Sequence, residues 1–367
     1  MGNTFELNAE MLQPIVRLEL DDQTAMPTSF ALHALKPGLG NPTSLGVYRA
    51  SGTATTASGD KPFSVVVKHL ACGLPMMDAS DPTHWNFWLR EIVFFESPLA
   101  ERIPASLDYP RYLGQTELPD GTCLFWNGDL GDLGMSVWTW DECLHAAELV
   151  AELNSIDMSD AADYPWLNRT QPEGWLELSA EFFMPAYEKF LEVVETEPEA
   201  VSGYETYGHW LPKRVEINAI IHSHRQVFAH GDFNLNNLVP SKGDRGLIAL
   251  DWQLCGMASV GSEVSAIYNT AHELGVTPAS QERFEEICEV YTRKFNELNP
   301  SDPVELNDVR LAAAARGYMI ICGVGFFLAG PNPELTEAEN NANLRLLSEN
   351  FSNGPLMVYA RVLNELA

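Results

Sequence analysis

Hydrophobic and polar positions in the first part of the chain follow the pattern of short strands. Apolar and β-branched runs predict strands over residues 30–35, 44–50, 63–70, 111–113 and 122–126. Turn-forming residues occupy 36–43, and a stretch rich in Ser, Thr, Ala and Gly occupies 51–60. We expect the second stretch to be a hairpin loop. Together these segments predict a small antiparallel sheet.

Helical periodicity occurs at two places within the first 126 residues and dominates the rest of the chain. Apolar residues recur every three or four positions, which predicts helices over residues 8–16, 84–100, 141–153, 177–194, 283–298, 308–329, 336–351 and 355–366. Strand-like runs at 226–229 and 246–250 interrupt the later helices. Turn residues from Asn127 to Gly131 separate the two halves. We therefore expect an N-terminal lobe over residues 1–126 and a mainly helical C-terminal lobe over residues 127–367, with a ligand cleft between them.

The chain is strongly acidic, with 51 Asp and Glu against 22 Lys and Arg and a net charge of −29. Such a chain repels the phosphates of nucleic acids and of anionic membranes, so we expect neither as a partner. The scattered acids fit a solvated surface, and a site for a cationic substrate is the alternative.

No segment has the pattern of a secretory signal or a membrane span. Residues 311–329 are apolar, but Arg316 and three glycines interrupt them, which favours a buried helix. The six cysteines include no C-x-x-C pair, so we expect reduced thiols and a cytoplasmic protein.

The candidate chemistry gathers between His230 and Asp251. The sequence His230-Gly231-Asp232 is followed by Asn237, and Asp251 comes at the end of an apolar run. Phosphoryl transfer needs a carboxylate beside the attacking hydroxyl and oxygen ligands for the metal that bridges the phosphates. Asp232 suits the first task, as the catalytic base. Asn237 and Asp251 suit the second, because Mg²⁺ prefers hard oxygen ligands and usually takes only one or two from a protein.

This combination resembles the signature of aminoglycoside phosphotransferases, choline kinases and related small-molecule kinases. The Gly after the His, the spacing from Asp to Asn, and the pair Asp251-Trp252 all agree with that family's pattern. The resemblance implies an α+β, protein-kinase-like two-lobe fold, with a small antiparallel β N-lobe and a larger, mainly helical C-lobe. It implies ATP or GTP and Mg²⁺ as cofactors and a hydroxylated small molecule as acceptor. For His230 it implies a structural role that braces the loop.

The same resemblance implies further residues in the first lobe. Lys68 ends a β-branched run and would contact the nucleotide's α- and β-phosphates. Glu91, in the helix expected over residues 84–100, would be its ion-pair partner, and Glu96 is the alternative. Adenine would be bound by backbone groups from Asn127 to Asp129.

The segment from Gly38 to Ser44 is similar to the phosphate-covering loop of that family. Gly38 and Gly40 would allow the backbone to approach phosphate, and Thr43 or Ser44 could donate hydroxyl hydrogen bonds. Pro42 departs from the pattern, because it removes one N–H donor. A plain hairpin turn fits the composition of this segment as well.

Three functions remain open on this basis. The first is a kinase that transfers the γ-phosphate of ATP to a hydroxyl of a small molecule. The acidic chain favours an acceptor with amines, such as an aminoglycoside or amino alcohol, and a neutral sugar-like metabolite is the alternative. The second is a nucleotide-binding protein with the same fold and no catalysis. The third is a protein kinase, against which Gly231 and the lack of a recognisable activation segment after Asp251 argue. The acceptor and the oligomeric state stay open.

Overall fold

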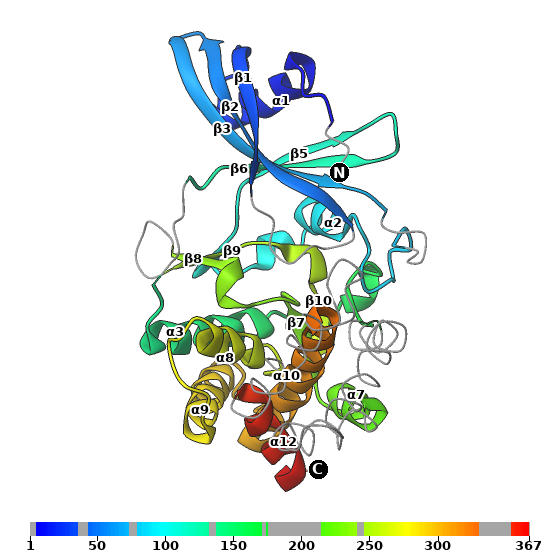
Figure 1. Ribbon diagram of the computed structural model, residues 1–367, viewed down its shortest axis with the longest axis vertical. Coiled ribbons are helices and arrows are strands. Elements are labelled where there is room, and N and C mark those ends of the chain that lie inside the picture. Colours follow the sequence, from blue (N-terminus) through cyan, green and yellow to red (C-terminus); the bar gives the residue numbers. More distant parts are fainter. Residues whose placement is uncertain are drawn as a thin grey trace, which may run out of the picture. The chain divides into compact units, whose positions relative to one another are not determined.

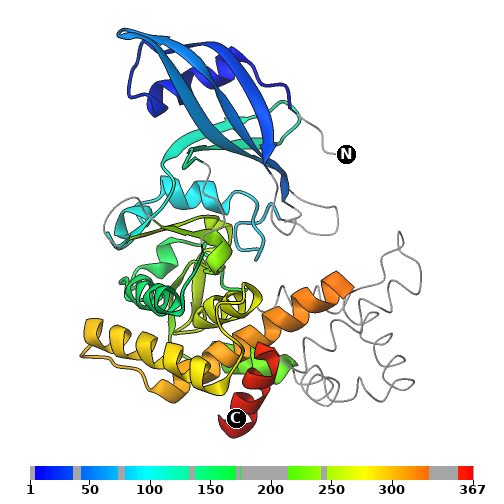
Figure 2. The ribbon, with the colours of Figure 1, turned by 60° about the vertical axis from the view of Figure 1, so that its left-hand side comes forward.

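The computed structural model divides the chain into two compact units, which Figures 1 and 2 show with their helices and strands. It describes residues 5–35, 43–72, 79–131, 137–170, 174, 214–240, 246–329 and 354–366. The first unit comprises Met1–Ser136, Pro165–Leu167 and Val239–Leu254. The second unit comprises Val137–Tyr164, Asn168–Leu238 and Cys255–Ala367. The first unit therefore includes a late stretch of chain that lies far beyond the expected lobe boundary at residue 126.

A five-stranded antiparallel sheet in the order β1-β2-β3-β6-β5 forms the body of the first unit (Figure 1). Its strands are β1 (Met26–Leu35), β2 (Ser44–Thr56), β3 (Gly59–Leu70), β5 (Tyr112–Glu117) and β6 (Cys123–Gly128). The loop predicted over residues 51–60 is wrong, because β2 and β3 stay paired up to Thr56 and Gly59. The Thr and Ser side chains in this stretch suit a strand, and the turn itself needs only Ala57 and Ser58.

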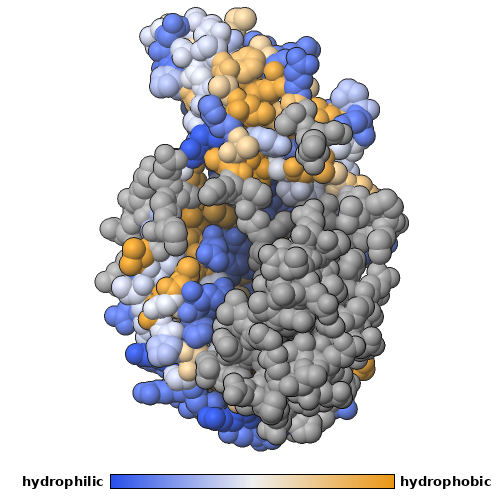
Figure 3. All heavy atoms as spheres, in the orientation of Figure 1, coloured by the Kyte–Doolittle hydropathy of each residue, from blue (hydrophilic) through white to orange (hydrophobic). Residues whose placement is uncertain are grey.

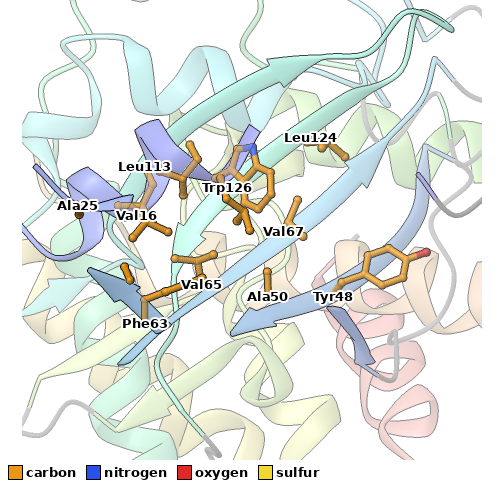
Figure 4. Close-up of a cluster of buried hydrophobic side chains, with 13 residues drawn as sticks. Val16, Ala25, Tyr48, Ala50, Phe63, Val65, Val67, Leu113, Leu124 and Trp126 are labelled. Atoms are coloured by element: carbon orange, nitrogen blue, oxygen red, sulfur yellow. The ribbon is translucent and has the colours of Figure 1, made fainter. Parts of the chain in front are cut away.

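The helix α1 (Ala9–Glu19) packs against one face of this sheet. It begins after Asn8, whose side chain accepts a hydrogen bond from the N–H of Met11 at 3.0 Å. Its inward side chains meet alternate residues of the central strands, as Figure 4 shows for Val16, Val65, Val67 and Trp126. This alternation leaves the remaining positions of the same strands for the opposite face.

The opposite face carries a smaller core, in which Leu70 and Phe125 pack with Ile92 of α2 (Arg90–Glu96). The helix predicted over residues 84–100 is therefore much shorter than expected. Before α2, the side chain of Asp81 accepts hydrogen bonds from the N–H and hydroxyl of Thr83, both at 2.8 Å. Such a turn competes with helix formation, so the apolar residues ahead of α2 are buried in turns.

The first unit also contains short strands and 3₁₀ turns, two of which lie on either side of Asp251 in the chain. The 3₁₀ turn η1 (Ala100–Arg102) precedes β4 (Leu107–Asp108), which pairs in parallel with β9 (Leu247–Ala249). The strand β8 (Leu238–Pro240) pairs on the other side of β9. A further 3₁₀ turn, η6 (Trp252–Leu254), follows Asp251 directly.

The second unit is mainly helical (Figure 2). Its described elements are α3 (Trp140–Asn154), η2 (Ala161–Asp163), α7 (Arg214–Ser223), β7 (Gln226–Ala229), η5 (Leu235–Asn237), β10 (Gly256–Ser259), α8 (Val264–Glu273), α9 (Gln281–Leu298), α10 (Leu306–Ala329) and α12 (Pro355–Leu366). β7 and β10 pair antiparallel. A capping box between Thr139 and Glu142 starts α3. The predicted α+β fold, with an antiparallel sheet in the first part and helices in the second, is confirmed.

Most of the helices expected in the second unit are present. Those predicted over residues 141–153, 283–298, 308–329 and 355–366 match described helices. Those predicted over residues 177–194 and 336–351 lie outside the described residues. Within the part of the chain that the structure describes, no helix is long and apolar enough to span a membrane. On the face drawn in Figure 3, hydrophilic residues line the lower edge of the described surface, whereas hydrophobic residues gather over the sheet of the first unit.

Candidate active site

Three charged side chains from distant parts of the sequence meet in the first unit. Lys68 Nζ lies 2.7 Å from Glu91 Oε2 and 2.9 Å from Asp251 Oδ1. The lysine comes from β3, Glu91 from α2, and Asp251 from the turn after β9. The ion pair therefore forms with Glu91, whereas the alternative Glu96 accepts a hydrogen bond from the Tyr112 hydroxyl at 2.7 Å.

Electrostatics keep the amine of Lys68 protonated. Burial opposes its charge, but the carboxylates of Asp251 and Glu91 outweigh burial and raise the pKa of Lys68 above its usual range. Burial raises the pKa of Glu91, and the charge of Lys68 opposes this rise. The cluster thus presents a fixed positive charge, the kind of group that attracts phosphate oxygens.

Asp251 has an unusual backbone for a residue with a side chain. Its φ is 63°, in the left-handed region, and its side chain is half-exposed. Such a conformation is strained for most residues and persists where the surroundings hold it. Here the next residue does so: Trp252 is fully buried and stacks on Phe94, with ring centroids 4.7 Å apart. The packed indole holds the turn that presents the Asp251 carboxylate.

The residues expected to cover the phosphates are described only in part. Gly38 and Gly40 lie outside the described residues. Thr43 is fully buried, and its hydroxyl accepts a hydrogen bond from the side-chain amide of Gln253. Ser44 begins β2 and is partly exposed. The Thr43 hydroxyl therefore already has a protein partner, and contact of either hydroxyl with phosphate stays a prediction.

The expected adenine-binding segment begins inside a strand. β6 continues through Asn127 and Gly128, which the sequence had indicated as turn residues. The carboxylate of Asp129 accepts a hydrogen bond from Ser64 Oγ at 2.5 Å and forms an ion pair with Arg49 Nε at 2.8 Å. Burial would raise the pKa of Asp129, but its hydrogen bonds, that from Ser64 first, lower it. The side chain of Asp129 thus secures the end of β6, and binding of adenine by the backbone here stays a prediction.

In the second unit, the loop after β7 holds Asp232 between two amides. Asp232 Oδ1 accepts a hydrogen bond from Asn234 Nδ2 and Oδ2 accepts one from Asn237 Nδ2, both at 2.8 Å. Asn234 also starts the 3₁₀ turn η5 by accepting the N–H of Asn236 at 3.0 Å. The two amides fix the orientation of the carboxylate. Because the Asn237 nitrogen is a donor here, the amide oxygen is its group that can bind a metal.

A buried carboxylate that sequence reasoning missed supports this loop. Glu263 accepts hydrogen bonds from the backbone N–H groups of His230 at 3.1 Å and Gly231 at 2.8 Å. Burial raises the pKa of Glu263, and the charge of Arg316 opposes this rise. Arg316 Nη2 also donates to the Gly231 carbonyl at 2.5 Å. The charge of Arg316 in an apolar helix was visible in the sequence, but its partners were not.

His230 and Gly231 shape the backbone just before Asp232, and the contacts of His230 fit the bracing role that the resemblance implied. His230 is fully buried, and its Nδ1 accepts a hydrogen bond from the N–H of Asp232 at 3.2 Å. Gly231 has a φ of 87°, which glycine adopts far more readily than other residues. The loop therefore turns at Gly231 and is tied at His230, just before the carboxylate of Asp232.

Comparisons with known proteins agree with this architecture. Residues 143–300 match the model of the EcKL family, described as ecdysteroid kinase-like. A comparison of the sequence with curated proteins found no match. An amicoumacin kinase solved with AMP-PNP, Ca²⁺ and its ligand Ami is similar in structure at 13% identity, with a TM-score of 0.52 over 94% of this chain and 93% of that one.

Two further solved structures share the fold. Spectinomycin phosphotransferase, in complex with ADP and spectinomycin, matches at 11% identity with a TM-score of 0.51 and covers 98% of this chain and 99% of that one. The GDP and kanamycin complex of APH(2")-IIia matches at 12% identity with a TM-score of 0.50, over 93% of this chain and 98% of that one. The resemblance found in the sequence is thus supported, and this chain has the protein-kinase-like fold of the aminoglycoside phosphotransferases, with an ecdysteroid kinase-like match over residues 143–300.

Proposed function

We propose that this protein is a phosphotransferase that moves the γ-phosphate of ATP to a hydroxyl group of a small molecule. The observation that carries the proposal is the position of Lys68 Nζ, held between Glu91 and Asp251 at 2.7 and 2.9 Å. A protonated amine beside a half-exposed carboxylate suits a nucleotide's phosphates and their metal ion. Three proteins of the same fold were solved with AMP-PNP, ADP or GDP, which supports a nucleotide as the donor.

The donor atoms of the chain fit Mg²⁺ as the metal. The Asp251 carboxylate and the Asn237 amide oxygen are hard oxygen ligands, and Mg²⁺ usually takes only one or two ligands from the protein. Within the described residues, no group of three or more His, Cys, Asp or Glu side chains could hold a metal ion by itself. Bound Mg²⁺ would supply charge neutralisation at the phosphates. Asp251 and Asn237 are the residues proposed to hold it.

Asp232 is the proposed base. The amides of Asn234 and Asn237 orient its two oxygens, so the carboxylate can accept the proton of an acceptor hydroxyl. The acceptor oxygen attacks the γ-phosphorus, the bond from that phosphorus to the β-γ bridging oxygen breaks, and the proton passes to Asp232. The backbone tie to Glu263 keeps the loop in place during this transfer.

The proposed acceptor carries amines. The net charge of −29 favours a cationic small molecule over an anionic one. Two of the similar structures contain spectinomycin and kanamycin. An aminoglycoside or an amino alcohol is therefore the first class to test, and a neutral sugar-like metabolite is the second.

Release of ADP from ATP, or of GDP from GTP, followed over a panel of hydroxylated acceptors, tests the function. Each acceptor is assayed with ATP and with GTP, with Mg²⁺ and after its removal by a chelator. Metal-dependent turnover of at least one acceptor is the expected result. Tight nucleotide binding without turnover of any acceptor would favour a non-catalytic protein, and loss of nucleotide binding altogether would remove the basis of the proposal.

A further inference from the structure

A second polar network of the first unit lies beside the cluster of Lys68, Glu91 and Asp251. It centres on Arg90, which precedes Glu91 in α2 and is fully buried. Its guanidinium donates to the backbone carbonyls of Trp166 at 2.8 Å, Trp85 at 2.9 Å and His84 at 2.5 Å. A buried guanidinium needs such partners, because an unpaired charge is costly to bury. Arg90 is thereby an anchor for several segments.

Arg90 and its neighbour Glu91 also contact the two residues that follow Asp251. Arg90 Nη1 also donates to the carbonyl of Gln253 at 3.1 Å. The neighbouring Glu91 accepts the N–H of Trp252 at 3.1 Å. Two consecutive residues of α2 therefore hold two consecutive residues that follow Asp251. The position of Asp251 is set by these contacts as well as by its own ion pair with Lys68.

The side chain of Gln253 extends this network to Thr43, which lies just before β2. It is buried, with 6% of its surface exposed, and its amide nitrogen donates to the hydroxyl of the fully buried Thr43. The carbonyl of Thr43 accepts the N–H of Ala71 at 2.9 Å, just beyond the end of β3. Gln253 is therefore held at its backbone by Arg90 and at its side chain by Thr43.

We propose that Gln253 is a positioning residue for nucleotide binding, which joins Thr43, the residue just before β2, to the turn that presents Asp251. The proposal rests on the function proposed above. Lys68 and the half-exposed Asp251 would contact phosphate and metal, whereas Gln253 is buried and acts through its neighbours. The Gln253 side-chain amide sets the distance between the paired strands β2 and β3, of which β3 carries Lys68, and the turn that carries Asp251. A hydrogen bond in a buried site holds such a distance better than an apolar contact, because its geometry is directional.

Variants of the two partners test the proposal. Gln253→Leu and Thr43→Val each remove one side of the hydrogen bond with little change in volume. The expected result for each is a rise of about 3- to 10-fold in the KM for ATP, the range that corresponds to one hydrogen bond. The KM for the acceptor stays close to that of the wild type. The double variant raises the KM for ATP no further than the larger single effect, because both changes remove the same contact.

Controls separate this role from a general loss of stability. Gln115→Leu and Thr28→Val are the same substitutions at exposed hydrogen bonds of the same sheet, and they leave the KM for ATP unchanged. Thr43→Ser keeps the hydroxyl and restores the wild-type KM. Thermal unfolding of each variant, measured without nucleotide, reports any loss of stability separately.

The outcomes distinguish this proposal from the proposed function. If the wild type turns over ATP and Gln253→Leu has the wild-type KM for ATP, the positioning role is overturned. Additive effects of Gln253→Leu and Thr43→Val, or equal changes in the KM for ATP and for the acceptor, would overturn it as well. If the wild type neither binds nucleotide nor releases ADP with any acceptor, the proposed function itself fails.

Discussion

Glu91 accepts a hydrogen bond from the backbone N–H of Trp252 at 3.1 Å, although the two residues lie 161 positions apart in the chain. The same carboxylate forms the ion pair with Lys68 through its other oxygen. One side chain therefore ties together β3, α2 and the turn after β9. Loss of its charge and loss of its hydrogen bond can be separated by substitution.

Glu91→Gln removes the charge and keeps an oxygen that can accept the N–H of Trp252. We expect the KM for ATP to rise by about 10-fold or more, because a hydrogen bond to a charged group contributes roughly 1.5–3 kcal/mol. Steady-state kinetics at saturating acceptor measures this. Glu96→Gln is the matched control, since Glu96 contacts Tyr112 and not Lys68. A larger effect at Glu96 than at Glu91 would contradict the assignment.

Asp232→Ala removes the proposed base. We expect turnover to fall by a factor on the order of 10²–10⁴, with nucleotide affinity largely intact. Asp251→Ala should instead weaken nucleotide binding in the presence of Mg²⁺. Isothermal titration with a non-hydrolysable ATP analogue, together with single-turnover assays, distinguishes the two. Asn236→Ala, an exposed residue of the same loop, should leave turnover unchanged. Near-full activity of Asp232→Ala would disprove the proposed mechanism.

Gly231→Ala places a side chain at a φ of 87°. We expect the free energy of unfolding to fall by about 1–2 kcal/mol, the cost of the left-handed region for a residue with a Cβ. Gly121→Ala is the control, because its φ is 83° and an added Cβ there would meet no atom within 4 Å. Chemical denaturation should give similar losses for both variants. Only Gly231→Ala should also lose turnover, because only Gly231 adjoins Asp232.

Glu263 gives a dependence of stability on pH. Its folded-state pKa is raised by burial, although Arg316 opposes the rise. A carboxyl group with a raised pKa binds a proton more tightly in the folded state than in the unfolded state. The stability it contributes is therefore fully present below its unfolded pKa, near 4.5, and is lost as pH rises through the folded value.

Glu263→Gln removes this titration. We expect the free energy of unfolding of the wild type to fall, relative to that of the variant, as pH rises above about 4.5. Urea denaturation across a pH series measures the difference, whose slope is unaffected by any constant loss of stability in the variant. Parallel curves for the two proteins would show that Glu263 does not titrate as described.

Much of the fold could be predicted because its elements have simple patterns. β7 follows from a short run of strand-forming residues, and the amphipathic α9 follows from helical periodicity. The helix α8 could not be predicted, because all its residues from Val264 to Ala271 are buried and it has no polar face to reveal its period. The prediction also began α2 too early, at residue 84 and not at Arg90. Trp85 and Phe87 are buried in turns, where spacing alone resembles a helix.

Residues of the candidate site could be predicted where their type and spacing matched the sequence pattern of a known family. Lys68 and Glu91 form the ion pair that the family resemblance implied, with the lysine at the end of a β-branched strand and the glutamate on the helix that follows. Arg90, Gln253 and Glu263 were not predictable. Their roles depend on backbone groups and hydroxyls far away in the chain, and the sequence carries no pattern for such contacts.

The first unit is completed by residues 239–254, which come after the loop that carries Asp232. During synthesis on the ribosome, the first 136 residues therefore emerge without the ring that stacks on Phe94 and without the second carboxylate of Lys68. Both partners, Trp252 and Asp251, become available only after the loop that carries Asp232 has been synthesised. Growing chains stopped before residue 251 thus lack both the Asp251 carboxylate that pairs with Lys68 and the Trp252 ring that stacks on Phe94, although the loop that carries Asp232 is already made.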